Sequence, residues 1–105
     1  MLDLGAGDGG FLRTLRRQGF RDLGAHEIPG HNMSKLRMVV DRIYIDTDYL
    51  SVPDGSFDAV TMLDVLEHVP DPQATVLACA RILRPGGLLY LHTPCVSRLD
   101  GIMHA

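Results

Sequence analysis

The stretch Met1-Leu2-Asp3-Leu4-Gly5-Ala6-Gly7-Asp8-Gly9-Gly10-Phe11-Leu12 decides the fold of this 105-residue chain. A short apolar segment ends in alternating glycines and continues directly into a pattern of helical spacing. A buried parallel strand that turns over a ligand into a helix has this form. Glycine is needed because the backbone must bend, partly at positive φ, and let a ligand approach more closely than a Cβ permits. We therefore expect the glycine turn to be the ligand site.

The spacing of the glycines fits two classes of cofactor. Gly5-x-Gly7-x-x-Gly10 satisfies the dinucleotide fingerprint, and Gly5-x-Gly7-x-Gly9 is typical of class I S-adenosylmethionine (SAM) methyltransferases. Asp3 favours the second class, because dinucleotide-binding strands are usually apolar up to the first glycine. A carboxylate at this position suits a ligand that carries an ammonium and a sulfonium group. An NAD-binding oxidoreductase domain remains the less favoured alternative.

Three segments carry a resemblance to one family. Leu2–Gly9 resembles the first motif of the SAM-dependent methyltransferases. Leu63–Pro72 is similar to the segment after the fourth strand in small-molecule methyltransferases of the quinone-biosynthesis type, and Arg81–Leu88 also matches that family. The resemblance runs in order from Met1 to about Pro94. It implies SAM as the cofactor and methyl transfer to a small-molecule acceptor as the activity.

The fold class expected is α/β, with a Rossmann-like, doubly wound, mostly parallel sheet of about five strands. The expected strands are 1–4, 21–27, 42–45, 57–62 and 88–92, and the expected helices are 9–18, a short one within 29–40, and one that Asp71 caps and Pro72 begins. The resemblance implies the strand order 3-2-1-4-5 in a single, partial SAM-binding domain over residues 1–105. Without a C-terminal antiparallel hairpin, the fifth strand is expected to form an open edge that favours self-association.

Glu27 is the residue most clearly assigned to the cofactor. It stands at the tip of the second predicted strand, 20 residues after Gly7. An acidic side chain there accepts hydrogen bonds from the two ribose hydroxyls of an adenosine ligand. The alternative is that Glu27 is an exposed carboxylate in a turn.

The resemblance implies a second acidic contact, to the adenine amine, after the third strand. Counting back from Phe57-Asp58 favours Asp46 over Asp48. The first residues after the fourth strand flank the methionine part of the cofactor in the family. The complete set of predicted cofactor contacts is Asp3, Gly5, Ala6, Gly7, Gly9, Glu27, Ile28, Asp46, Thr47 and Leu63.

The implied reaction requires no nucleophilic side chain, because the sulfonium is itself a good leaving group. His68, beside Glu67 or near Asp64, is a candidate base for a substrate hydroxyl, although a role in capping or packing the turn fits it better. The motif of enzymes that methylate amino groups of adenine or glutamine is missing at Leu63–Leu66. We therefore expect an oxygen or carbon acceptor, with a non-catalytic SAM-binding fragment as the alternative.

Composition argues against several other classes of partner. The net charge is −3, with 10 basic and 13 acidic residues, and the cluster Arg13, Arg16 and Arg17 fits a solvated helix end, so no nucleic-acid partner is expected. Cys79 and Cys95 lack CxxC spacing, which indicates a reduced compartment, and no segment resembles a signal peptide, so a cytoplasmic location is expected. The histidines have no metal-ligand spacing. No apolar run approaches the roughly 20 residues of a membrane span.

Overall fold

The computed structural model describes residues 1–28, 30, 33–46, 49–63, 65 and 68–92, and the backbone of 101–104. Within these residues the strands form a single six-stranded sheet. The strands are β1 (Leu2–Leu4), β2 (Gly24–His26), β3 (Arg42–Tyr44), β4 (Phe57–Leu63), β5 (Leu83–His92) and β6 (Gly101–His104). The helices are α1 (Gly10–Arg17), α2 (Met33–Arg37) and α3 (Pro72–Ile82).

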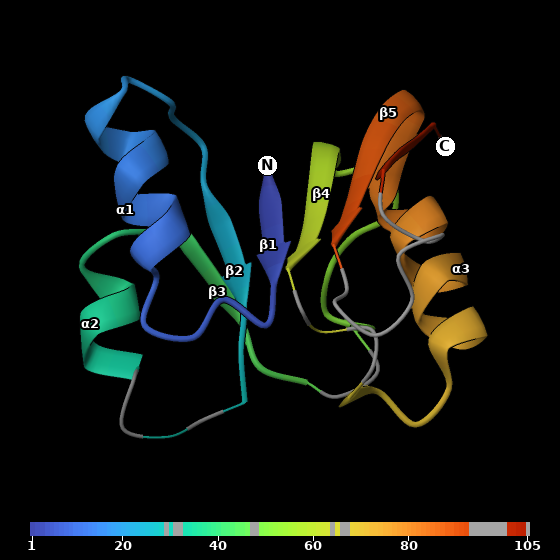
Figure 1. Ribbon diagram of the computed structural model, residues 1–105, viewed down its shortest axis with the longest axis horizontal. Helices are drawn as coiled ribbons and strands as arrows, with labels where there is room; N and C mark the ends of the chain where they lie inside the picture. The colour runs from blue at the N-terminus through green and yellow to red at the C-terminus, as the bar shows by residue number, and fades with distance from the viewer. Residues whose placement is uncertain are drawn as a thin grey trace.

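The sheet has the order β3-β2-β1-β4-β5-β6, which confirms the predicted order of the first five strands. These five strands pair in parallel. Helices α1 and α2 lie on one side of the sheet and α3 lies on the other (Figure 1). The carboxyl ends of the parallel strands therefore share one edge of the sheet, where open α/β folds bind their ligands.

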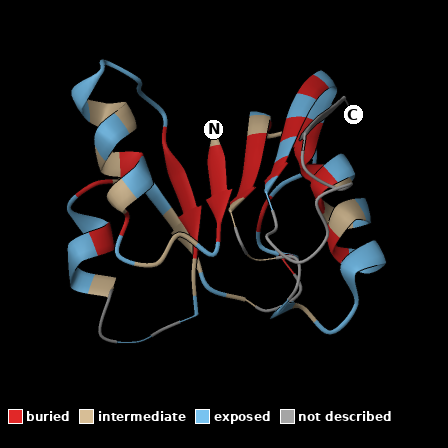
Figure 2. Ribbon diagram, in the orientation of Figure 1, coloured by how far each residue is buried: buried red, intermediate tan, exposed pale blue. Residues whose placement is uncertain are grey.

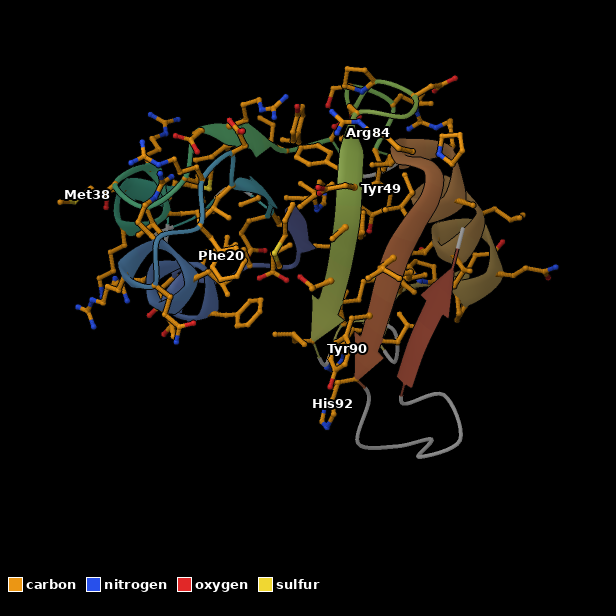
Figure 3. The ribbon with its side chains drawn as sticks, turned by 90° about the horizontal axis from the view of Figure 1, so that it is seen from above. Phe20, Met38, Tyr49, Arg84, Tyr90 and His92 are labelled. Atoms are coloured by element: carbon orange, nitrogen blue, oxygen red, sulfur yellow. The ribbon has the colours of Figure 1, made fainter. Side chains whose placement is uncertain are left out.

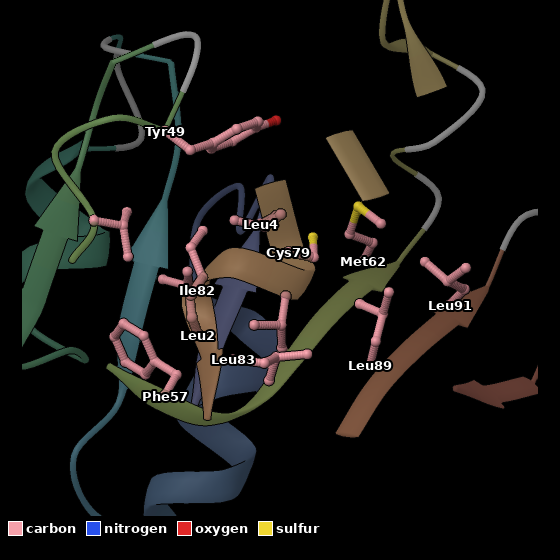
Figure 4. Close-up of a cluster of buried hydrophobic side chains, with 12 residues drawn as sticks. Leu2, Leu4, Tyr49, Phe57, Met62, Cys79, Ile82, Leu83, Leu89 and Leu91 are labelled. Atoms are coloured by element: carbon pink, nitrogen blue, oxygen red, sulfur yellow. The ribbon is translucent and has the colours of Figure 1, made fainter. Parts of the chain in front are cut away.

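The buried core has two parts, one on each face of the sheet. Buried strand positions dominate the centre of Figure 2. The larger cluster packs the sheet against α3 (Figure 4) and contains Leu2, Leu4, Tyr49, Val52, Phe57, Val60, Met62, Cys79, Ile82, Leu83, Leu89 and Leu91. The smaller cluster packs the sheet against α1 and α2 and contains Leu12, Leu23, Ala25, Leu36 and Val39. Side chains alternate along a strand, so Asp3 points away from the face to which Leu2 and Leu4 belong.

Helix α3 begins at the predicted residue and α1 begins one residue later than predicted, and the two starts have different causes. The Asp71 carboxylate accepts a hydrogen bond from Ala74 N at 3.1 Å, and Pro72 occupies the first helical turn of α3. This confirms the predicted cap. Helix α1 follows Gly9, whose φ of 84° is left-handed, and has no side-chain cap. A Cβ on Gly9 would lie 3.0 Å from a methyl group of Leu36, so this glycine also lets α2 pack closely against the turn.

The first and last residues of two predicted strands need correction. The second strand is shorter than residues 21–27, because Leu23 N donates to the Asp41 carboxylate at 2.9 Å and not to a neighbouring strand. The fifth strand begins at Leu83, five residues before its predicted start at Leu88, and its register with β4 shifts between Phe57 and Ala59.

The prediction that the fifth strand forms an open edge is wrong. Strand β6 pairs with β5 in antiparallel fashion, from Leu88 opposite His104 to Leu91 opposite Gly101. The sequence after residue 93 has no apolar alternation that would have indicated this strand. In the described residues, the edges of the sheet are therefore β3 and β6.

The described cysteine, Cys79, is a free thiol in the core, and its burial raises its pKa to about 12. Cys95 lies outside the described residues. Of the described helices, none combines the length and the apolar character that crossing a membrane requires.

Candidate functional site

The turn after β1 is anchored to the end of β2 by its backbone. Gly5 N and Ala6 N both donate to the His26 carbonyl, at 2.8 and 3.1 Å. Gly5 and Gly7 have φ values of 70° and 61°, in the left-handed region that favours glycine. A Cβ on Gly5 would lie 2.5 Å from a methyl group of Val65, so the turn has no room for a side chain there.

The carboxylate of Glu27 is hydrogen-bonded to this turn. Its Oε2 accepts a hydrogen bond from Gly7 N at 2.5 Å, and its Oε1 accepts one from Ile28 N at 2.8 Å. The backbone of Glu27 is fixed as well, because its N–H donates to the Tyr44 carbonyl of β3 at 3.1 Å. The carboxylate is only partly buried. A carboxylate offers about four acceptor sites, so two more donors, such as a pair of ribose hydroxyls, can be accommodated.

A cavity of about 310 Å³ opens at this edge of the sheet. Its lining residues are Gly5, His26, Glu27, Ile28, Tyr49, Leu63, Val65, His68 and Val69. Of the predicted site residues, Gly5, Glu27, Ile28, Leu63 and His68 are thus brought together. The volume is at the lower end of the range for small-molecule sites, and the mixture of apolar walls and few polar groups is typical of them.

The other predicted residues of the turn lie beside the cavity and do not line it. Gly7 is separated from the cavity by the Glu27 carboxylate. A Cβ added to Gly7 would lie 3.9 Å from Glu27 Oε2. Gly9 packs against Leu36 of α2. Ala6 is part of the turn that His26 anchors. The glycines therefore act more by shaping the turn than by forming the cavity wall.

Asp3 is buried beneath the turn, with only 3% of its surface exposed. Its Oδ1 accepts a hydrogen bond from the Thr61 hydroxyl of β4 at 2.7 Å. Burial raises the pKa of Asp3 to about 6, the Thr61 hydrogen bond opposes the rise, and the negative charge of Glu27 adds to it. Asp3 is not part of the cavity wall, so its influence on a ligand would be electrostatic.

Asp46 lies in the loop that follows β3. Its carboxylate accepts hydrogen bonds from the backbone N of Ser51 at 2.9 Å and from the Ser51 hydroxyl. The Asp46 carbonyl accepts a hydrogen bond from His26 Nε2 at 2.6 Å. Thr47 and Asp48 lie outside the described residues, as do Asp64 and Glu67. The choice between Asp46 and Asp48 as the adenine contact therefore stays a prediction.

Sequence reasoning missed four residues of the wall, namely His26, Tyr49, Val65 and Val69. His26 is 6% exposed, and its ring centroid lies 4.4 Å from that of Tyr49. A signal for His26 existed, because it is the last residue of a strand whose next residue was already assigned to the site. Tyr49 gave no signal, since it stands in an irregular loop and has a φ of 62°, which is rare for a tyrosine.

A second hollow, of about 300 Å³, lies between α1 and α2. Its walls are Arg13, Arg16, Arg17, Lys35, Met38 and Val39. Arg16 is a structural link here, because it donates to the Val39 carbonyl and to the Asp41 carboxylate, both at 2.9 Å. Figure 3 shows Met38, the residue after α2, projecting outward and away from Tyr49. This hollow has neither a glycine turn nor a carboxylate in its wall, so the cavity beside Glu27 fits an adenosine ligand better.

Among the described residues, no group of three or more His, Cys, Asp or Glu side chains is arranged to hold a metal ion.

Comparison with known proteins gives a consistent result. The sequence profile described as "Methyltransferase domain" matches residues 1–103. The ubiquinone biosynthesis O-methyltransferase of Xanthomonas oryzae pv. oryzae is 39% identical over 103 residues, which cover 89% of this chain and 42% of that protein. The protein of the same name from Xanthomonas campestris pv. campestris is 38% identical over the same lengths. The chain thus spans less than half the length of these curated relatives.

Solved structures agree on the fold. A methyltransferase in complex with the Trm112 methyltransferase activator of Haloferax volcanii is 31% identical, with a TM-score of 0.74 over 86% of this chain and 42% of that one. A SAM-dependent methyltransferase from Mesorhizobium loti is 25% identical, with a TM-score of 0.76 over 88% and 45% of the two chains. The cyclase SpnF also matches, with 24% identity and a TM-score of 0.75 over 86% and 36%. The last likeness concerns the fold alone, and it illustrates that this fold does not by itself dictate one reaction.

Proposed function

Because this chain belongs to the family of methyltransferase domains, we propose that it forms the SAM-binding part of an enzyme that methylates a small molecule. The family and the SAM-dependent relatives point to SAM as the cofactor. The observation that carries the proposal is the Glu27 carboxylate, held against Gly7 N on the wall of a cavity of about 310 Å³. The dinucleotide alternative has no support from these relatives.

The residues present fit the parts of SAM. Glu27 would accept hydrogen bonds from the ribose hydroxyls, with the glycine turn beneath the sugar. The adenine would lie between Ile28 and the loop that begins at Asp46, whose carboxylate would accept from the adenine amine. Leu63 would flank the methionine part. The buried charge of Asp3 would favour a cationic ligand over a neutral one.

When bound, SAM supplies a methyl group that is electrophilic because it is attached to a sulfonium. The chain's own residues then have to orient the ligand and keep water away. His68 lines the same cavity as Leu63, so it is our candidate for the side chain that takes a proton from an acceptor hydroxyl. We propose oxygen as the acceptor atom, because the relatives in Xanthomonas are named O-methyltransferases. Carbon is the alternative.

Calorimetry with SAM and S-adenosylhomocysteine (SAH) tests the assignment of Glu27. Glu27→Ala should weaken binding of both ligands by about 100-fold, since it removes a charged acceptor from two hydroxyls. Asp58→Asn is the control, because this exposed carboxylate lies at the start of β4, whereas the cavity lies at the other end of the strand, beside Leu63. Equal affinities of wild type and Glu27→Ala would remove Glu27 from the site. Binding of NAD without SAM would contradict the proposed function.

Whether this chain is catalytic on its own is a separate question. A non-catalytic SAM-binding fragment predicts the same calorimetric result, and no methyl transfer by this chain in a labelled-SAM assay with hydroxylated aromatic acceptors. Transfer of label to an acceptor oxygen would exclude that alternative. A cytoplasmic location and the absence of a nucleic-acid partner stay predictions.

A further inference from the structure

Arg81, in the last turn of α3, makes a set of contacts that the proposed chemistry does not use. One guanidinium nitrogen donates to the Val52 carbonyl at 2.8 Å and to the Asp54 carboxylate at 2.6 Å. The other terminal nitrogen donates to the Tyr49 carbonyl at 2.8 Å. The backbone of the same residue also takes part, since the Arg81 carbonyl accepts from Gly55 N at 2.9 Å. One residue of α3 thus holds four positions of the loop between β3 and β4.

This loop forms a wall of the cavity through Tyr49. The Tyr49 backbone has a left-handed φ of 62°, a conformation that is strained for a residue with a Cβ. The Arg81 bond to its carbonyl offsets that strain. The Tyr49 side chain is only 8% exposed and packs on His26, which in turn donates to the Asp46 carbonyl. The contacts therefore run from Arg81 through Tyr49 and His26 to Asp46.

We propose that Arg81 is a positioning residue that fixes the part of the loop between β3 and β4 from Tyr49 to Gly55 and thereby sets how well the site recognises adenine. The inference rests on the proposed function, because it assumes that the loop contacts the adenosine part of SAM. Arg81 itself is not part of the cavity wall, so it acts through the loop. Its planar guanidinium spreads its donors over two terminal nitrogens and so reaches acceptors on both sides, whereas the compact ammonium of lysine lacks this geometry.

The test uses Arg81→Met, which removes the donors but keeps a long side chain of similar helix propensity. Binding of SAH and of S-inosylhomocysteine, whose base lacks the amine, is measured by calorimetry. The readout is the discrimination ratio, defined as the Kd of S-inosylhomocysteine divided by that of SAH. Arg81→Met should weaken the binding of SAH about tenfold or more, since the loop loses several hydrogen bonds from a charged donor. The discrimination ratio should fall toward one, because the loop no longer holds the group that contacts the amine.

Three comparison variants separate positioning from simple destabilisation. Arg81→Lys should give an intermediate ratio, and it serves also if Arg81→Met does not fold. Asp54→Asn removes only the exposed end of the contact, and should change the ratio less than about twofold. Arg84→Met replaces an exposed arginine three residues away and should change nothing.

The outcomes are distinguishable. A wild-type chain that binds neither SAH nor SAM contradicts the proposed function itself. A wild type that binds SAH and prefers it over the inosine analogue, together with an unchanged ratio in Arg81→Met and Arg81→Lys, overturns this inference alone. If Arg81→Met unfolds at a lower urea concentration but keeps the discrimination ratio of the wild type, the inference is also overturned. A merely structural role lowers the folded fraction without altering discrimination.

Discussion

The two sides of the cavity are held in different ways. The glycine turn and Glu27 are fixed by backbone groups and by one carboxylate, with Gly7 N donating to Glu27 Oε2 at 2.5 Å. The loop after β3 is fixed by side chains from other elements, above all by Arg81 of α3. The hydrogen bonds of the first side come mostly from the backbone of the turn and of β2, with one more from Glu27 N to the Tyr44 carbonyl of β3. The second side takes three of its side-chain hydrogen bonds from a helix far away in the sequence, so it depends more on tertiary packing.

Substitution of Gly5 should have the largest effect, because it tests how tightly the glycine turn is packed. Gly5→Ala adds a Cβ that would lie 2.5 Å from a Val65 methyl group, at a φ of 70°. Left-handed strain and overpacking together should lower the free energy of unfolding by about 2–5 kcal/mol. Urea denaturation measures the loss, and calorimetry should show that SAH binding is lost as well.

Gly19 supplies the matched control for this substitution. Its φ is 95°, but a Cβ there would meet nothing within 4 Å. Gly19→Ala should therefore cost only the backbone strain, about 1–2 kcal/mol, with no change in affinity. If Gly5→Ala and Gly19→Ala destabilise equally, the close contact with Val65 has no energetic weight.

Asp3→Asn should have the next largest effect on the free energy of unfolding, and it should stabilise the chain where Gly5→Ala destabilises it. The folded state raises the pKa of this buried carboxyl from 3.8 to about 6, so the folded chain holds a proton that the unfolded chain has released. Stability should thus fall as pH rises from about 4 to about 6 and stay lower above that range. The difference corresponds to about 3 kcal/mol at neutral pH. Asp3→Asn keeps an acceptor for Thr61, so it should recover most of this energy and flatten the pH dependence measured by urea denaturation.

The same variant tests whether Asp3 acts on the ligand. SAM carries a sulfonium and SAH does not, so Asp3→Asn should weaken SAM more than SAH at pH 7.5. Thr61→Val is a useful companion, because it removes the hydroxyl that opposes the rise in the pKa of Asp3. A SAM to SAH preference that Asp3→Asn leaves unchanged would make Asp3 a structural residue only.

The sequence predicts the first side of the site far better than the second. Gly5, Gly7 and Glu27 lie in one stretch with a characteristic spacing, so their places at the turn can be predicted without knowing the rest of the fold. Tyr49 and Arg81 are 32 residues apart and belong to no motif that links them. Their contact arises from where α3 packs, which periodicity does not specify. Strand β6 escaped prediction for a different reason, since the sequence after residue 93 has no apolar alternation, although β6 pairs with the strand that precedes it in the chain.

Ser51 gives the smallest and most local test of the loop side. Its hydroxyl and its backbone N–H both donate to the Asp46 carboxylate. Ser51→Ala removes one of these two bonds at an exposed site, so the free energy of unfolding should fall by only about 0.5–1 kcal/mol. The backbone bond still orients the carboxylate, and the SAH affinity should drop by less than about threefold. A drop as large as that expected for Arg81→Met would show that Ser51 controls the position of Asp46 at least as strongly as Arg81 does.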